Sequence, residues 1–180
     1  RFTAFIGYEW TSNTGGNNLH RNVIFRDNGD KASQVEPYVT MKPFGSDNPR
    51  DLWKWMEAYE QKTGGRMLSI PHNSNLSGPG LMFESAKLTG AADASQPVTA
   101  EEAQLRQRWE PLVEIMQHKG DSECMNGLSG VIGASDEQCS FEKDPRPFQD
   151  CGDGTGGGGV ARFGCFSRLD FVRNVLLAGM

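Results

Sequence analysis

The chain has 180 residues, of which 18 are basic and 23 acidic, so its formal net charge at neutral pH is −5. The Lys and Arg residues form no cluster, which argues against nucleic acid as a main partner, because phosphate backbones are bound by concentrated basic surfaces. No apolar run approaches the about 20 residues that span a bilayer, so we expect no membrane span. The length suits one ordinary domain.

The predicted elements begin with an apolar strand over residues 2–10, which carries Glu9 near its end. A Gly- and Asn-rich loop over residues 11–18 leads to a second strand over residues 19–25, which contains His20. A carboxylate in an apolar strand is costly to bury unless it is paired or binds a cation, although a strand-end Glu also simply reaches water. A lone strand His is more often a hydrogen-bonded core residue than a metal ligand.

A helix is predicted next, because Asp47 or Asn48 can cap its start and Pro49 suits its first turn. Gly64 marks its end. The apolar residues between these signals recur at helical spacing, and they are Leu52, Trp53, Met56 and Tyr59. The pattern therefore predicts an amphipathic helix packed on a core.

A short apolar strand over residues 67–70 stops at Pro71, since proline cannot donate to a sheet ladder. His72, Asn73 and Asn75 follow immediately. Polar, metal-competent side chains at strand carboxyl ends are how α/β barrels and open α/β sheets build active sites. The competing interpretation is an Asn- and Ser-rich turn in which the His is incidental.

The order of helix and strand then recurs. Residues 99–102 read as a capping box that opens a second helix, and a strand over residues 112–116 carries Glu114. Repeated helix–strand units with near-continuous apolar strands indicate an α/β fold with a parallel sheet or barrel. Glu9, His72 and Glu114 would then meet in one shared polar site.

Lys119 follows this last strand and is suited to binding an anionic group such as phosphate. Residues 121–166 are rich in Gly, Asp and Cys and are predicted to form a long surface loop or insertion. The last third of the chain holds all four cysteines, Cys124, Cys139, Cys151 and Cys165. An even, clustered set indicates two disulfides and an exported protein, with a structural zinc site as the competing interpretation. Their pairing cannot be read from the sequence.

Five segments carry a family resemblance, and they occur in the order NNLHRNVIF (residues 17–25), NPRDLW (48–53), IPHNSNL (70–76), PLVEI (111–115) and KGDSE (119–123). Together they resemble the bacterial domain-of-unknown-function family 3604, which is similar to the PHP (polymerase and histidinol phosphatase) metallohydrolase superfamily. The superfamily's opening His-x-His and closing Asp-x-His motifs are absent. The chain starts without Met in an apolar run and stops in a helix that begins near Phe171, so we expect residues 1–180 to be a partial copy cut at both ends.

The resemblance implies a fragment of a distorted, TIM-like (β/α) barrel with two or three divalent metals at the strand carboxyl ends. The implied site consists of the metal ligands Glu9, His20 and His72, the catalytic groups Glu114 and Lys119, and the substrate-binding residues Arg21, Asn73 and Asn75. Mixed His and carboxylate ligands suit zinc, manganese or iron.

The expected function is that of a metal-dependent hydrolase of the phosphoesterase type, in which a di- or trinuclear site activates water against a small-molecule substrate such as a phosphate ester. The alternatives are a non-catalytic, ligand-binding barrel and an inactive truncated fragment. A periplasmic or secreted location is expected, with the cytoplasm as the alternative. The sequence does not determine the oligomeric state.

Overall fold

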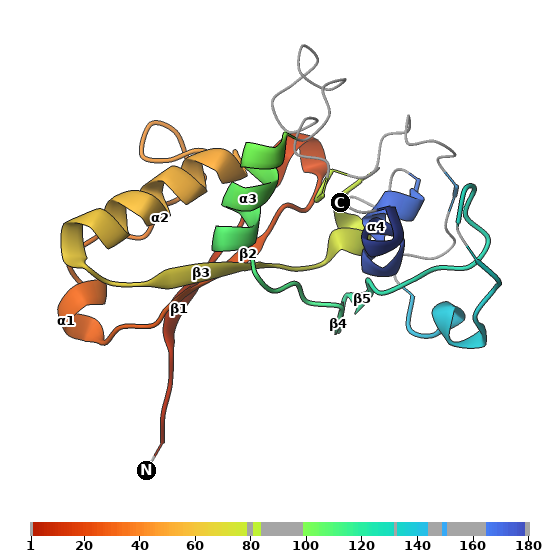
Figure 1. The fold of residues 1–180 in the computed structure, drawn as a ribbon, viewed down its shortest axis with the longest axis horizontal. Coiled ribbons are helices and arrows are strands. Elements are labelled where there is room, and N and C mark those ends of the chain that lie inside the picture. The colour runs from red at the N-terminus through yellow and green to blue at the C-terminus, as the bar shows by residue number, and fades with distance from the viewer. Residues whose placement is uncertain are drawn as a thin grey trace.

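The computed structural model describes residues 2–78, 81–83, 99–131, 133–143, 149–150 and 165–178. These residues form a mixed α/β fold with two small antiparallel sheets. The larger sheet has the strand order β1-β2-β3, and Figure 1 shows helices α2 and α3 on one side of it. Its strands are β1 (Ile6–Trp10), β2 (Arg21–Phe25) and β3 (Met67–Pro71).

Side chains along each strand alternate between the face covered by helices and an open face. On β2, Arg21, Val23 and Phe25 are buried, whereas the two residues between them are only half-buried. The register aligns Trp10 with Arg21 and Arg21 with Pro71, so the C-terminal ends of β1 and β3 lie beside the N-terminal end of β2. Side chains at and just beyond these three strand ends are therefore close together.

The expected α/β class is confirmed, but the expected parallel sheet is wrong. Both strand pairs of the larger sheet are antiparallel, and the described residues form no barrel. Helices cover a single face, which an antiparallel sheet tolerates, whereas a parallel sheet is normally covered on both faces. A helix can connect two antiparallel strands as well as two parallel ones. The order of helices and strands along the chain therefore does not determine strand direction.

Helix α2 (Pro49–Thr63) forms as its local signals predict. The side chain of Asn48 accepts a hydrogen bond from the backbone N of Arg50 at 3.0 Å, and Gly64 ends the helix with a positive φ of 63°. The helix packs on the sheet through the core residues Trp10, Val23, Phe25, Leu52, Trp53, Met56, Tyr59, Met67 and Trp109.

Helix α3 (Ala100–Trp109) begins at a partial capping box. Oγ1 of Thr99 accepts from the backbone N of Glu102 at 3.2 Å. The Glu102 carboxylate pairs with Arg50 of α2 at 2.7 Å, so it connects the two helices. Within the described part of the chain, no helix is both long and apolar enough to cross a bilayer.

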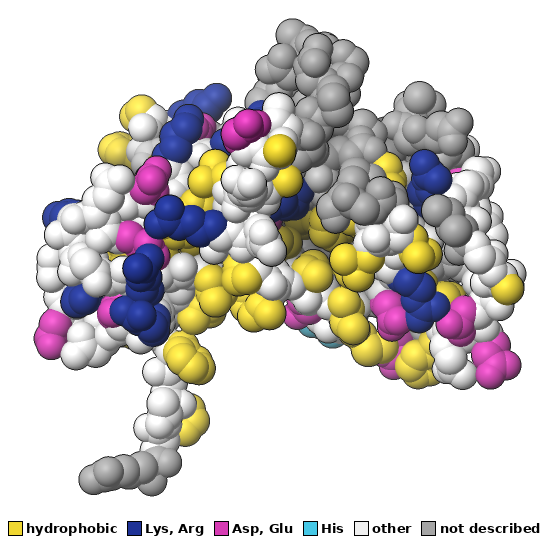
Figure 2. All heavy atoms as spheres, in the orientation of Figure 1, with side chains coloured by type: hydrophobic (Ala, Val, Ile, Leu, Met, Phe, Trp, Pro, Cys, Tyr) yellow, Lys and Arg dark blue, Asp and Glu magenta, His cyan; other side chains and the backbone are white. Residues whose placement is uncertain are grey.

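The strand predicted over residues 112–116 is absent. Strand β4 consists of Met116–Gln117 and pairs with β5 (Gly120–Asp121) in a small hairpin. The preceding residues cross the end of β3, where the backbone N of Glu114 donates to the backbone O of Pro71 at 3.0 Å. Apolar residues of this segment are exposed, including Leu112 at 56%, and Figure 2 shows apolar side chains across the middle of the visible face. An apolar run forms a strand only where a neighbouring strand runs alongside it.

The predicted long loop over residues 121–166 contains one 3-10 helix, η4 (Glu137–Ser140), among its described residues. A disulfide joins Cys124 to Cys139, and no cysteine in the described part of the chain is free. Cys151 and the four-glycine run lie outside the described residues. A second small core, separate from the sheet, consists of Met125, Leu128, Phe166 and Phe171.

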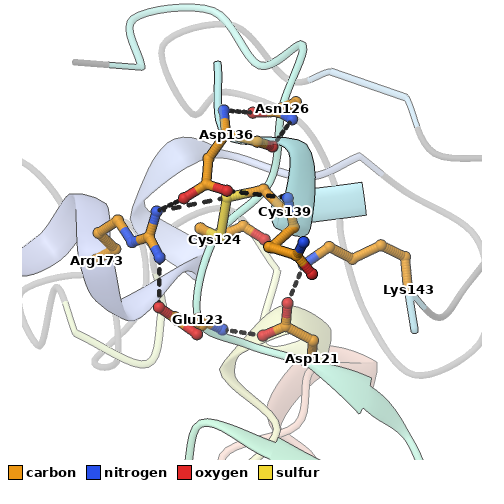
Figure 3. Close-up of a disulfide and its surroundings, with 9 residues drawn as sticks. Asp121, Glu123, Cys124, Asn126, Asp136, Cys139, Lys143 and Arg173 are labelled. Atoms are coloured by element: carbon orange, nitrogen blue, oxygen red, sulfur yellow. Dashed lines mark hydrogen bonds and ion pairs between the residues drawn. A yellow bond between two sulfur atoms is a disulfide. The ribbon is translucent and has the colours of Figure 1, made fainter. Parts of the chain in front are cut away.

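Ion pairs connect this disulfide-bonded segment to the C-terminal helix α4 (Val172–Ala178). Arg173 donates to Glu123, just before Cys124, at 2.5 Å and to Asp136, within the loop that the disulfide closes, at 2.7 Å (Figure 3). Lys143 pairs with Asp121 at 2.5 Å in a buried position. The described part of this segment is therefore closed by a disulfide and joined to α4 by ion pairs.

Candidate metal centre

Three polar residues, Glu9, His20 and His72, converge at one end of the strands of the larger sheet. Glu9 lies on β1 next to the inward-facing Trp10, so strand alternation places its carboxylate on the open face. His20 immediately precedes β2 and His72 immediately follows β3. The backbone N of His72 donates to the backbone O of His20 at 3.3 Å, which extends the antiparallel pairing to both imidazoles.

The three side chains contact one another directly. Oε1 of Glu9 lies 2.9 Å from Nδ1 of His20 and 3.1 Å from Nε2 of His72. One potential ligand atom from each residue lies within 4.8 Å of the others. Both imidazoles are buried, with 7% and 4% of their surfaces exposed, whereas the Glu9 side chain is 44% exposed. The arrangement is a small polar cluster with buried nitrogens and one side open to solvent.

The protonation of the cluster favours an anionic carboxylate and a neutral His20. Burial raises the pKa of Glu9, but the hydrogen bond from His72 and the charges of the two imidazoles lower it by more in total, so its pKa lies below the ordinary value. Burial lowers the pKa of His20, and the attraction of Glu9 only partly offsets this. A neutral imidazole and an ionised carboxylate are the states that bind a cation.

The hydrogen bonds around His20 fit a metal ligand. Its Nε2 lies 2.9 Å from Oδ1 of Asn13, and metal-bound histidines usually donate their second ring N–H to an oxygen in this way. Its buried Nδ1 lies 2.9 Å from Oε1 of Glu9, which is an ion-pair distance. A proton on Nδ1, or a cation bound by both atoms, stabilises this approach. The donor set of two nitrogens and one oxygen suits zinc, manganese or iron.

Asn73 and Asn75 follow His72 but differ in their contacts. Asn73 has a left-handed backbone (φ 56°) and is buried, and neither polar atom of its side chain has a hydrogen-bond partner among the described residues. Asn75 accepts from Oγ of Ser122 at 2.8 Å and donates to the backbone O of Lys119 at 3.1 Å. Asn75 therefore holds the β4–β5 hairpin beside the cluster, whereas the side chain of Asn73 is available for a ligand.

Glu114 and Lys119 reach the neighbourhood of the cluster through this hairpin. The backbone of Glu114 bonds to Pro71, the residue before His72, and its side chain accepts from Gln117 at 2.8 Å. Lys119 lies in the turn between β4 and β5, and its positive charge is one of the causes that lower the pKa of His20.

Arg21 is not placed with the cluster, which corrects its assignment to substrate binding. Its side chain is completely buried on the helix-covered face, and its Nε pairs with Oε1 of Glu110 at 2.8 Å. Successive residues of a strand point to opposite faces, so His20 and Arg21 cannot serve the same site. The alternation of side chains between the two faces of a strand is the sequence signal that could have separated Arg21 from His20.

Asn13 is a contact of the cluster that the sequence does not reveal. It lies just before the 3-10 helix η1 (Thr14–Gly16), in the segment predicted to be a Gly- and Asn-rich loop. No spacing rule links it to His20, because the loop conformation alone brings its side chain to the imidazole.

Comparison with known proteins adds a family but no activity. The family model described as "Protein of unknown function (DUF3604)" matches residues 1–180. No curated protein and no solved structure matches the chain.

Proposed function

The chain belongs to the DUF3604 family, and we propose that it is a metal-dependent hydrolase of the phosphoesterase type. The observation that carries this proposal is the convergence of Glu9, His20 and His72, which lie in or directly beside three different strands and whose ligand atoms lie within 4.8 Å of one another. The proposed relationship between this chain and the PHP metallohydrolases rests on the sequence segments around these residues, which resemble that superfamily.

In the proposed site, Glu9, His20 and His72 bind a divalent cation, with zinc, manganese or iron as the candidates. Three protein ligands leave coordination positions for water and substrate, which is typical of catalytic rather than structural sites. A bound cation supplies Lewis-acid activation of water for hydrolysis. The exposed side of Glu9 marks the direction from which substrate enters, because both imidazoles are buried. Further ions, as in a di- or trinuclear site, belong to the same proposal.

The proposed substrate is a small anionic ester. Lys119, whose charge lowers the pKa of His20, is the group proposed to offset negative charge on a phosphoryl group. Asn73 offers, as a hydrogen-bonding group, a buried side-chain amide that has no partner in the described part of the chain. Glu114, held at the end of β3, is the second carboxylate near the site and is proposed to position the reacting groups. The disulfide between Cys124 and Cys139 supports a periplasmic or secreted location.

The first test measures metal content by elemental analysis and hydrolysis of a generic phosphomonoester and phosphodiester. We expect bound zinc, manganese or iron together with turnover. Glu9→Gln keeps the size of the side chain but removes its charge, so it should lower both metal content and turnover. A folded protein that binds no metal when each ion is added back would overturn the proposal. Tight metal binding without turnover of either ester would favour the non-catalytic binding protein instead.

A further inference from the structure

The open face of the larger sheet is apolar next to the candidate metal centre. Strand alternation and register place Ile24 of β2 and both Leu68 and Ile70 of β3 on this face, the same face that carries Glu9. All three side chains are half-buried, whereas the residues that alternate with them along β2 and β3 are buried on the helix-covered side. We call these three residues the apolar surface of the sheet.

The strand register connects the apolar surface to Glu9. Glu9 is aligned with Asn22 and Asn22 with Ile70, so Ile70 lies two strand spacings, about 10 Å, from Glu9. The next row of residues on the same face consists of Gly7, Ile24 and Leu68. The apolar surface therefore begins within two strands of the carboxylate and continues away from it along β2 and β3.

Gly7 and Ile24 determine the chemistry of the face beside Glu9. A Cβ on Gly7 would lie 3.0 Å from Cδ1 of Ile24, so Ile24 covers the position where a side chain of β1 would stand. Glu9 and Asn22 are the only polar side chains that the described strands of the larger sheet place on this face. A polar group of a ligand on this surface would lose water without gaining a hydrogen-bond partner from it. An apolar group is stabilised there by its burial.

We infer that the proposed phosphoesterase acts on esters whose non-reacting group is apolar, such as alkyl phosphates, and that this group lies on the apolar surface. The inference rests on the proposed function and names the substrate class of the same site. Glu9 is the exposed member of the metal cluster, and the apolar surface lies on the same open face of the sheet. Contiguous exposed apolar surface on a soluble protein typically marks a binding site.

The test compares kcat/KM for methyl, butyl and hexyl phosphate with metal-loaded protein. A fully buried methylene is worth about fourfold, and contact with one side of an open face about twofold. We therefore expect kcat/KM to rise by about 30-fold from methyl to hexyl phosphate, at twofold per added methylene. Equal values along the series would overturn the inference and leave the hydrolase activity in place.

A double variant tests whether this preference comes from the apolar surface. Ile24→Thr with Leu68→Thr replaces two apolar side chains by a β-branched polar residue that a strand accommodates. The ratio of kcat/KM for hexyl over methyl phosphate should fall by about tenfold. Leu105→Gln is the control, because it removes a partly exposed apolar side chain from α3, on the covered side of the sheet (Figure 1), and should keep the wild-type ratio. Equal ratios in the wild type and the double variant would contradict the inference.

Binding of hexylphosphonate and methylphosphonate, which are not hydrolysed, separates this inference from the proposed function. We expect calorimetry with added zinc to show tighter binding of hexylphosphonate and a more negative heat-capacity change, because apolar surface is buried. If no ester were hydrolysed, this preference would support the apolar surface while the proposed hydrolase failed. Equal affinities for the two phosphonates would overturn the inference. A wild-type dimer that dissociates in the double variant would also overturn it, because the face would then belong to a second copy.

Discussion

Arg21 and Glu110 form an ion pair that is almost completely removed from solvent. Nε of Arg21 lies 2.8 Å from Oε1 of Glu110, and the two side chains are 0% and 1% exposed. The same carboxylate accepts from Nε1 of Trp53 at 3.0 Å and from Nε of Arg106 at 3.2 Å. Glu110 thus joins β2, α2 and α3 at one point, on the opposite face of the sheet from His20.

Removing the Glu110 carboxylate should strongly destabilise the fold. Glu110→Ala leaves the guanidinium groups of Arg21 and Arg106 buried without their counter-charge, and breaking a buried pair in this way typically costs about 3–5 kcal/mol. Urea unfolding followed by tryptophan fluorescence measures the change. Lys54→Ala, which breaks the exposed pair with Asp51, is the control and should cost less than about 1 kcal/mol. Similar losses in both variants would contradict a structural role for the buried network.

The same carboxylate predicts how stability depends on pH. Burial raises the pKa of Glu110, but the charges of Arg21 and Arg106 and the hydrogen bonds that it accepts lower the pKa by more in total. A group whose pKa is lower in the folded than in the unfolded state stabilises the fold above its unfolded pKa, and this contribution is lost as the pH falls through the folded pKa.

We therefore expect urea midpoints to fall as the pH is lowered below the ordinary value of 4.5 for a Glu side chain. A series of unfolding curves between about pH 7 and pH 3 measures this. Glu110→Gln should have a lower midpoint at neutral pH and a shallower decline in acid. A decline as steep as in the wild type would place the titrating group elsewhere.

His72 and His118 should differ sharply in their effect on bound metal. His72→Ala removes a buried member of the cluster, and we expect metal content and hydrolysis to fall together. His118 is exposed in the β4–β5 turn, so His118→Ala should change both by less than twofold, about 0.4 kcal/mol. Elemental analysis and ester hydrolysis of the two variants give the answer. Loss of activity in His72→Ala with unchanged metal content would remove His72 from the proposed ligands.

Lys119 should affect substrate rather than metal. Its charge lowers the pKa of His20, while its backbone O accepts from Asn75, and Lys119→Gln preserves the backbone contact. We expect kcat/KM for phosphate esters to fall by about tenfold or more, equivalent to about 1.4 kcal/mol of lost binding to the anion. Metal content should stay at the wild-type value. A parallel loss of metal would indicate that Lys119 supports the cluster itself.

The disulfide should contribute measurably to the stability of the C-terminal part. It closes a sequence separation of 15 residues, and a loop of that size restricts the unfolded chain by about 3 kcal/mol. Replacing both Cys124 and Cys139 with Ser should lower the free energy of unfolding by that order. Arg173→Ala, which removes half-exposed ion pairs to the same segment, should cost about 1 kcal/mol or less. Equal urea midpoints for the oxidised wild type and the double Ser variant would contradict this role.

The sequence by itself determined the elements whose signals are local. Asn48, Pro49 and Gly64 bound α2 within a few residues, since caps and turns depend on neighbouring backbone atoms only. Thr99 likewise marks the start of α3. The family resemblance of the sequence singled out Glu9, His20 and His72 as metal ligands, and these residues do lie together, although metal binding stays a prediction.

Tertiary structure alone decided how distant segments pair. Strand direction depends on which backbone groups meet across the sheet, so the antiparallel order was not readable from a helix followed by a strand. Residues 112–116 were apolar enough for a strand but cross the end of β3, where they are left partly exposed. Asn13 reaches His20 because its loop is tied to Asp47, 35 residues from Ser12 in sequence. Such long-range contacts depend on the whole fold, whereas composition and periodicity indicate only the local secondary structure of a segment.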